Sequence, residues 1–226
     1  VSKFGPVAIF MLLTRTFASY GVEHLKPAVA YVILTVALLL IFLIIGYPAF
    51  IAIFAHLDPF KFAKKITRVA VFGFSTSSSA ATLPLNVKTT VEELGVDEKI
   101  ASFVLPLGMT INMNGTAIMQ VIATLFIAGC AGYSISFTQL VVIALLALIA
   151  SAGTPAAPGS GAIILFTILS GLGYVNDAAM LAYSLILAIN RPIEMLVTAL
   201  NVVGDSATSI YVAKSEGVLN EDVYNA

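Results

Sequence analysis

The sequence predicts an all-α membrane protein that contains two re-entrant helical hairpins. Of its 226 residues, 59% are apolar and 10% are charged, whereas a soluble domain has roughly 45–50% apolar and about 25% charged residues. Several apolar runs reach the length of a membrane-spanning helix, and two others are interrupted by segments rich in serine, glycine and proline. So few charged residues cannot cover the surface of a soluble fold. We therefore expect a multi-pass protein of the cell membrane, surrounded by the lipid bilayer.

The composition excludes several other classes of protein. The 11 basic residues are balanced by 12 acidic residues, which leaves no basic excess for binding nucleic acid. Cys130 is the only cysteine, which excludes a disulfide framework and a cysteine-rich metal site. No nucleophile stands paired with a base beside the polar segments, so we do not expect an enzyme. The chain starts at Val1 with what reads as the second half of a helix, which indicates a longer protein.

The first predicted elements are a spanning helix and a short hairpin. Residues 28–55 form an apolar run that exceeds the roughly 20 residues needed to cross a bilayer. A basic cluster follows at positions 61–68, and the positive-inside rule places it in the cytoplasm. Residues 62–96 form two short arms around the polar segment 75–84. Neither arm is long enough to span, so we predict a hairpin that enters the membrane and returns to the same side.

The second half of the chain repeats this order. Residues 100–129 are long enough to span the membrane but contain the motif NMNGT at 112–116. These small and polar residues predict a broken helix. Backbone can unwind at this depth only where protein surrounds it or where it lines a cavity. Residues 137–174 form a second interrupted hairpin around 151–161, and residues 178–213 form one last helix. A hairpin followed by a helix thus occurs twice. This order is typical of secondary transporters with inverted repeats and a binding site between the hairpin tips.

The last predicted helix carries a stripe of polar side chains. A charged group at the centre of a membrane helix costs about 2.5–3.5 kcal/mol on insertion scales, so it commonly marks a site. On an ideal helix the stripe occupies about 100° of the circumference. It contains Asn190, Arg191, Glu194, Thr198, Asn201 and Asp205. The alternative is a polar seam against a neighbouring helix, with Arg191 and Glu194 as an internal ion pair.

Two kinds of ligand suit these polar groups. Asp205, Asn201 and Asn112 offer the hard oxygen atoms that sodium prefers, and we expect Asp205 to be the main cation ligand. The hairpin tips offer backbone N–H groups at helix N-termini, which bind carboxylates. The alternative for the serine-rich tip is close packing of small residues between helices.

Four motifs resemble those of one transporter family. They are STSSSAATLP at 75–84, INMNGTA at 111–117, APGSG at 157–161 and NVVGDS at 201–206. In this order they are similar to the motifs of the dicarboxylate/amino acid:cation symporters, which comprise glutamate and aspartate transporters and their neutral amino acid relatives. The resemblance covers essentially the whole chain.

The resemblance implies an elevator-type transporter that assembles as a homotrimer. Residues 1–60 would comprise the end of the fourth helix and a scaffold transmembrane helix, and residues 61–226 would form the transport domain. The coupled cation would be Na+, with H+ in part, and the partner would be a small-molecule substrate.

The resemblance also implies which residues bind these ligands. One sodium ion would be held by Gly108, Asn112, Asn201 and Asp205. A second would be held, largely through backbone oxygens, by Thr110, Met113, Ser151, Ala152 and Thr154. The substrate would contact Ser78, Ser79, Thr116, Ala157, Gly161, Thr198 and Asn201.

Three residues depart from the family pattern. Asn114 stands where a third sodium site has Asp, so we expect fewer coupled sodium ions. Val197, which should face the pocket, replaces the Arg that binds the side-chain carboxylate of acidic substrates. Glu194 replaces the Asp that binds the substrate amino group. We therefore expect an amino acid with a neutral side chain as substrate.

Two alternatives to this function stay open. The first is a symporter of dicarboxylates or acidic amino acids in which Arg191 takes the place of the missing Arg. The second is an anion-conducting channel, an activity that the family resemblance also implies. A channel passes current without substrate, whereas a symporter saturates and needs the cation gradient.

Overall fold

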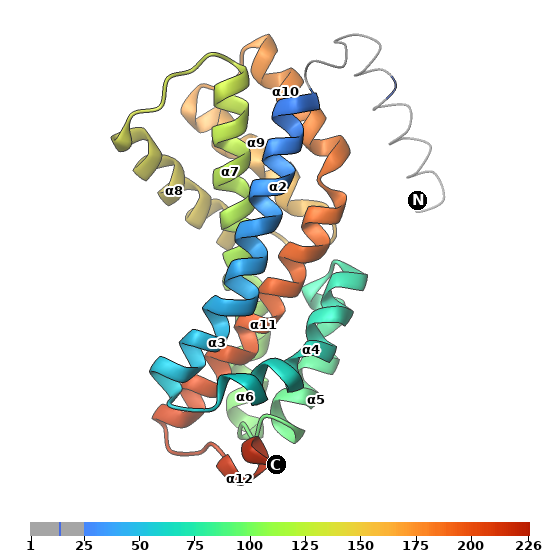
Figure 1. Cartoon of the computed structure of the whole chain (residues 1–226), viewed down its shortest axis with the longest axis vertical. Helices are drawn as coiled ribbons and strands as arrows, with labels where there is room; N and C mark the ends of the chain where they lie inside the picture. Colours follow the sequence, from blue (N-terminus) through green and yellow to red (C-terminus); the bar gives the residue numbers. More distant parts are fainter. Residues whose placement is uncertain (1–13, 15–24) are drawn as a thin grey trace.

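The computed structural model describes residue 14 and residues 25–226, and this part is built from helices and loops without a strand. The fold is elongated, with helix α11 (Arg191–Ser215) running through its middle (Figure 1). Three described stretches are long and apolar enough to cross a membrane: Pro27–Ala55, Glu98–Cys130 and Arg191–Ser215. Residues 1–13 and 15–24, which would contain most of the predicted end of the fourth helix, lie outside the described residues.

The first described run is helical from Leu25 to Ala55, as the apolar stretch predicts. It consists of α2 (Leu25–Ile41), the π-helical η2 (Phe42–Gly46), α3 (Tyr47–Phe50) and the π-helical η3 (Ile51–Ala55). This run packs against α11 and against α7 (Asn114–Cys130). The hydroxyl of Tyr31 donates a 2.7 Å hydrogen bond to Asn190 Oδ1. Whether residues 1–60 form a separate scaffold stays a prediction.

The first hairpin consists of α4 (Pro59–Thr76) and α5 (Ser79–Glu92). The chain reverses because Ser77 takes a left-handed conformation and Ser78 caps α5 by accepting from the backbone N–H of Ala81 at 3.2 Å. Hydrogen bonds fix the second arm to α11. Asn86 Nδ2 donates to the backbone oxygen of Val202 at 3.0 Å, and the hydroxyls of Thr90 and Ser206 lie 3.1 Å apart.

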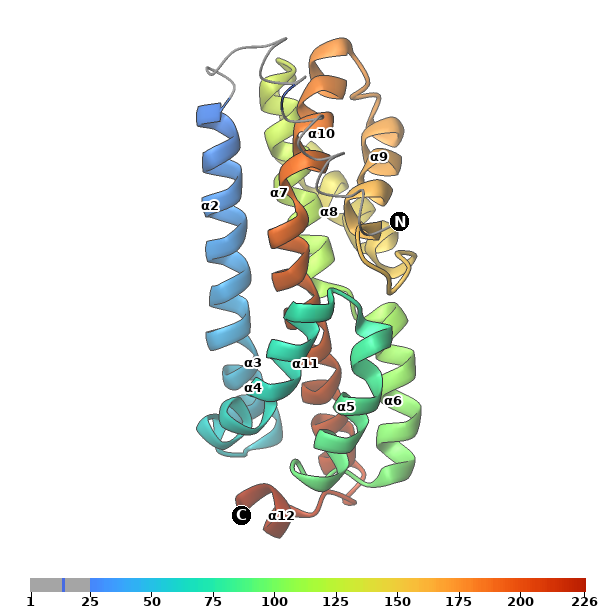
Figure 2. The ribbon, with the colours of Figure 1, turned by 90° about the vertical axis from the view of Figure 1, so that its right-hand side faces the viewer.

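The motif NMNGT interrupts the next helix. Helix α6 (Glu98–Ile111) ends before Asn112, and α7 (Asn114–Cys130) begins after Met113. The second hairpin follows with α8 (Phe137–Ala152) and α9 (Ser160–Leu172), joined by residues 153–159. Figure 2 shows the tip of α4–α5 and the loop before α9 approaching each other at mid-height.

The prediction of one continuous helix over residues 178–213 was wrong. The structure has α10 (Asp177–Ile189), a break at Asn190, and α11. Pro192 explains the break, because proline lacks the N–H of an intrahelical hydrogen bond and its ring collides with the carbonyl four residues earlier. Proline is tolerated in the first turn of a helix, so α11 begins just before it.

The polar tail after α11 folds back on the first hairpin. It contains the short helix α12 (Glu221–Asn225), and residues 220–225 are here called the C-terminal clasp. Tyr224 is fully buried and donates to the backbone oxygen of Asp58 at 2.8 Å. Lys65 Nζ donates to the backbone oxygens of Glu93, Val223 and Tyr224 at 2.8–2.9 Å. The clasp therefore joins both arms of the first hairpin to the end of α11.

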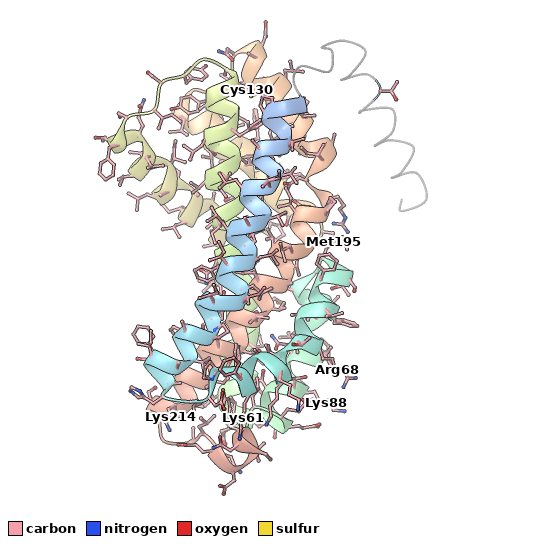
Figure 3. All side chains as sticks on the ribbon, in the orientation of Figure 1. Lys61, Arg68, Lys88, Cys130, Met195 and Lys214 are labelled. Carbon is pink, nitrogen blue, oxygen red and sulfur yellow. The ribbon has the colours of Figure 1, made fainter. Side chains whose placement is uncertain are left out.

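Basic residues gather in the same half of the molecule as the clasp. Lys61, Arg68, Lys88 and Lys214 lie there, whereas Cys130 lies at the opposite end (Figure 3). Two of these lysines contact the clasp, since Lys61 donates to the backbone oxygen of Asn225 and Lys214 pairs with Glu221.

The fold predicts different effects for two glycines of positive φ. Gly95 has a φ of +72°, and a methyl group there would overlap the backbone oxygen of Asn220 in the clasp. Gly217 has a φ of +71° and nothing within 4 Å, so Gly217→Ala carries only backbone strain of roughly 1–2 kcal/mol. We expect Gly95→Ala to lower the free energy of unfolding by about 1–3 kcal/mol more than Gly217→Ala does, because its methyl group overpacks the contact with the clasp. Thermal unfolding in detergent measures the difference, and equal melting temperatures would contradict it.

Candidate functional site

A small cavity lies where the two hairpin tips meet α7 and α11. Its volume is about 30 Å³, roughly the space of one or two water molecules. Many of the predicted binding residues line it: Ser79, Met113, Thr116, Thr154, Ala157, Gly161, Glu194, Val197, Thr198 and Asn201. Within this lining, Glu194 is the one charged residue. The cavity is thus smaller than an amino acid and is lined by polar and apolar residues together.

The two hairpin tips touch each other beside this cavity. The hydroxyl of Ser78, in the first tip, donates to the backbone oxygen of Ala156 in the second tip at 3.0 Å. Ser78 thus bridges the tips rather than lining the cavity. A ligand between the tips would have to replace this contact.

Asn201 fixes the start of α7 against α11. Its Oδ1 accepts from the backbone N–H of Gly115 at 2.8 Å, and its Nδ2 donates to Thr116 Oγ1 at 3.2 Å and to Met113 Sδ at 3.3 Å. A methyl group on Gly115 would lie 2.9 Å from the backbone oxygen of Val197. Glycine is therefore required for the two helices to approach this closely.

The residues of the first predicted sodium site lie together. Asn112 Nδ2 donates to Asp205 Oδ1 at 2.8 Å and to the backbone oxygen of Asn201 at 3.3 Å. Gly108 lies against the same carboxylate, because a methyl group on it would be 2.6 Å from Asp205 Oδ1. The carboxylate, amide and backbone oxygens form a donor set that suits sodium. A cation beside Asp205 would require the Asn112 amide to turn its oxygen toward the ion.

Asn114 extends this cluster to a tyrosine that sequence reasoning did not identify. Asn114 Nδ2 donates to Asn112 Oδ1 at 2.7 Å and to the hydroxyl of Tyr47 at 3.2 Å. A methyl group on Gly204 would overlap that hydroxyl, so Tyr47 fits tightly against α11. Nothing in its apolar surroundings in the sequence distinguishes Tyr47 from a packing residue.

The residues of the second predicted sodium site are less closely gathered. Met113 and Thr154 line the same cavity, and the side chain of Ser151 is buried. The hydroxyls of Thr110 and Ser151 each donate to a backbone oxygen of their own helix, and that of Thr154 donates to the backbone oxygen of Ala150 near the end of α8. Ala152 and Thr110 are exposed, and no hydrogen bond among the described residues joins Thr110 to the second hairpin.

Glu194 and Arg191 have different surroundings. Glu194 Oε1 accepts from the backbone N–H of Ala162 in the second hairpin at 3.1 Å. Its Oε2 lies 3.9 Å from Arg191 NH1, so the i,i+3 ion pair considered from the sequence is present. The side chain of Arg191 is 46% exposed and is not part of the cavity lining, whereas Val197 is buried in it.

Three further lining or adjacent residues did not follow from the sequence. The hydroxyl of Ser77 is buried beside the cavity without a hydrogen-bond partner in the described part of the chain. Met119 lines the cavity, and Gln120 Nε2 donates to the backbone oxygen of Gly161 at 3.1 Å. Gln120 offered a signal, because a buried amide in an apolar helix needs a partner. Ser77 and Met119 offered none.

Comparison with known proteins identifies the family. The sequence profile of the sodium:dicarboxylate symporter family matches residues 1–215. The chain belongs to this family. It is 31% identical over 213 residues to a putative sodium-dependent excitatory amino acid transporter, glt-4, of Caenorhabditis elegans, covering 93% of the chain and 42% of that protein.

Two other family members illustrate the range of the match. A proton/sodium-glutamate symport protein of Bacillus caldotenax is 31% identical over 223 residues, which cover 98% of the chain and 51% of that protein. Excitatory amino acid transporter 1 of Rattus norvegicus is 34% identical over 176 residues, which cover 78% of the chain and 32% of that protein. The chain thus spans between about a third and about half of the length of these relatives, which are transporters and not enzymes.

The cation cluster predicts a sensitive glycine. Gly108→Ala places a methyl group against the Asp205 carboxylate, and we expect it to weaken sodium binding at this predicted site roughly tenfold, since overpacking a tight contact costs about 1–3 kcal/mol. Gly129→Ala is the matched control, because this glycine of α7 has nothing within 4 Å. Titration of the melting temperature of the purified protein with sodium measures the effect. An unchanged sodium dependence in Gly108→Ala would exclude close packing of Gly108 on a working ligand.

Proposed function

We propose that the protein is a sodium-coupled secondary symporter of amino acids in the cell membrane. The observation that carries this proposal is the convergence of both hairpin tips and the polar side of α11 on one cavity, with Asp205 and Asn112 next to it. Such an arrangement would bring a substrate site and a cation site into contact. Binding of one ligand can then favour binding of the other, which is what coupled transport requires.

The cavity residues suit the two charged groups that every amino acid carries. The N-terminal turn of α5, with Ser78 and Ser79, offers donors for the α-carboxylate, and Asn201 offers an amide. Glu194 and Thr198 offer acceptors for the α-amino group. Serine, threonine and amide groups here replace hydrogen bonds that the substrate loses on leaving water.

We propose a substrate with a neutral side chain, because Val197 and the absence of a basic residue from the described cavity lining leave no partner for a second carboxylate. A buried carboxylate without a partner is strongly unfavourable. The second candidate is an acidic amino acid or dicarboxylate, and the names of the relatives favour it, since they refer to glutamate and to excitatory amino acids. In that case Arg191 would have to leave Glu194 and reach the cavity.

The remaining expectations are also proposals. We propose that the two hairpins are re-entrant, that transport follows an elevator mechanism, and that the protein works as a homotrimer. Sodium is the main coupled ion in this proposal, and protons contribute in part, in keeping with the proton/sodium naming of a bacterial relative. Anion conduction without substrate is the alternative activity.

Uptake by the purified protein in proteoliposomes tests the function. Neutral and acidic amino acids are offered one at a time, with and without an inward sodium gradient. Sodium-driven, saturable uptake supports the symporter, and substrate-independent current supports the channel.

Asp205→Asn should weaken the sodium dependence of uptake, because it removes a full ligand charge. Unchanged dependence in that variant would rule out Asp205 as the main cation ligand.

The neutral-substrate proposal predicts the effect of a basic side chain at position 197. Val197→Arg should raise the preference for aspartate or glutamate over neutral amino acids by about tenfold or more, because hydrogen bonds to charged groups contribute about 1.5–3 kcal/mol. Val197→Met is the control, since it adds length without charge. Competition binding measures both variants. If aspartate or succinate already displaces ligand from the wild type better than alanine or serine, the neutral substrate is wrong.

The neutral amide at position 114 predicts a low ion count. Asn114 Nδ2 donates to Asn112 Oδ1 at 2.7 Å, and a neutral amide at this position brings no ligand charge for a further cation. Asn114→Asp introduces a carboxylate and should raise the number of sodium ions moved per substrate by about one. Asn114→Ser is the neutral control. Reversal potentials of reconstituted protein give the ratio, and an equal ratio in wild type and Asn114→Asp would contradict the prediction.

A further inference from the structure

Met119 of α7 is a buried apolar side chain with a polar partner. It lines the cavity between the hairpin tips, and a methyl group on Gly161 would lie 3.0 Å from its Cε atom. Its sulfur accepts a hydrogen bond from Asn190 Nδ2 at 3.3 Å. A methionine side chain has several rotatable bonds and commonly adapts to its surroundings. Here the amide of Asn190 favours one arrangement of it.

Asn190 is in turn oriented by Tyr31 of α2. The hydroxyl of Tyr31 donates to Asn190 Oδ1 at 2.7 Å, so the NH2 group of the amide faces the sulfur of Met119. Reversing the amide would place its oxygen against the sulfur, which has no proton to donate. All three side chains are buried, and a buried polar group without a partner is unfavourable. Tyr31, Asn190 and Met119 are here called the Met119 relay.

The relay makes Met119 an apolar part of the cavity wall. Its sulfur is occupied by Asn190, and its methyl group lies toward Gly161, which lines the same cavity. Val197 adds another apolar side chain to the lining. Met119 and Val197 are here called the apolar wall.

Several polar groups of the lining already have hydrogen-bond partners. Thr116 Oγ1 accepts from Asn201 Nδ2, and Thr198 Oγ1 donates to a backbone oxygen of α11. The hydroxyl of Ser77, which has no partner among the described residues, belongs to the first hairpin tip, where the α-carboxylate is proposed to bind. A substrate side chain that points toward the apolar wall would therefore find little to replace its hydrogen bonds to water.

We propose that Met119 selects substrates with an apolar side chain over neutral substrates with a polar side chain, and that Asn190 and Tyr31 are positioning residues for this selection. The inference rests on the proposed function, since it concerns the side chain of the amino acid that would be carried. Among neutral amino acids, those with a hydroxyl or an amide in the side chain would bind more weakly. Without the relay, the sulfur of Met119 and the amide of Asn190 would offer an acceptor and a donor to such a side chain.

Pairs of amino acids with similar shapes test the selection. α-Aminobutyrate has a methyl group where serine has a hydroxyl, and leucine has methyl groups where asparagine has an amide. The intact protein is placed in lipid nanodiscs at saturating sodium, and the rise of its melting temperature with each amino acid gives the dissociation constant. The apolar member of each pair should bind about tenfold more tightly, because its partner buries a polar group without a hydrogen bond.

Substitutions of Met119 separate its role from that of the other lining residues. Met119→Gln puts an amide of similar length into the wall and should lower the preference for the apolar member about tenfold, because the amide can hydrogen-bond a polar side chain. Met119→Leu stays apolar and is the control that should keep the preference. A wild type that binds serine and asparagine as tightly as their apolar counterparts, or an unchanged preference in Met119→Gln, overturns the proposal. Amino acids that bind with the wrong preference contradict the selection alone, whereas a lack of binding by neutral and acidic amino acids contradicts the proposed function as well.

Tyr31→Phe tests the positioning without altering the cavity lining, and it also tests the selection if Met119→Gln does not fold. Isotope-labelled methionine methyl groups report on the relay by NMR without any substrate, and the Met119 signal is identified by its loss in Met119→Leu. In Tyr31→Phe this signal should shift or broaden, and the preference for apolar side chains should fall about threefold, since the amide of Asn190 is no longer held on the sulfur. Tyr183→Phe is the matched control, because its hydroxyl donates to the backbone of α9 and not to the relay. An unchanged Met119 signal or an unchanged preference in Tyr31→Phe overturns the proposal.

Discussion

Helix α11 carries two carboxylates and an amide through the middle of the molecule, with a second amide at its start, and all four groups are buried. Groups of this kind are strongly unfavourable in an apolar environment unless each has a partner. The rest of the described fold supplies these partners. Asp205 receives the amide of Asn112, Glu194 receives the start of α9, and Asn190 receives the hydroxyl of Tyr31. The need to give each buried polar group of α11 a hydrogen-bond partner therefore determines where the neighbouring helices begin and end.

Interrupted helices are the means by which these partners reach α11. A continuous helix uses its backbone N–H and C=O groups internally and has none to offer. The breaks at residues 112–113 and before α9 release such groups beside the cavity. Side chains from neighbouring elements then satisfy them, as Asn201 does for Gly115. Irregular backbone at this depth is stable because protein surrounds it.

The sequence predicted the features that local composition determines. The interruptions between α4 and α5, between α6 and α7 and between α8 and α9 coincide with clusters of small and polar residues within apolar runs. Pro192 indicates the break before α11, but the apolar residues on both sides of it made residues 178–213 resemble one continuous helix. Tyr47 and Ser77 could not be predicted, because their roles depend on which helix lies opposite. The contact of Glu194 with Ala162 was also beyond sequence reasoning, since a backbone N–H has no signature of its own.

The C-terminal clasp has a consequence for how the chain is assembled during synthesis. Gly95 and Lys65 emerge from the ribosome well before residues 220–225. Both contact the clasp, because Lys65 donates to two of its backbone oxygens and Gly95 packs against a third. The base of the first hairpin must therefore remain incompletely packed while the second hairpin and α11 are being translated and inserted. During this interval the lysine side chain lacks the two backbone oxygens of the clasp, and of its three acceptors only that of Glu93 has been synthesised. A chain that is released before residue 220 would lack these contacts and keep the base of the first hairpin incompletely packed.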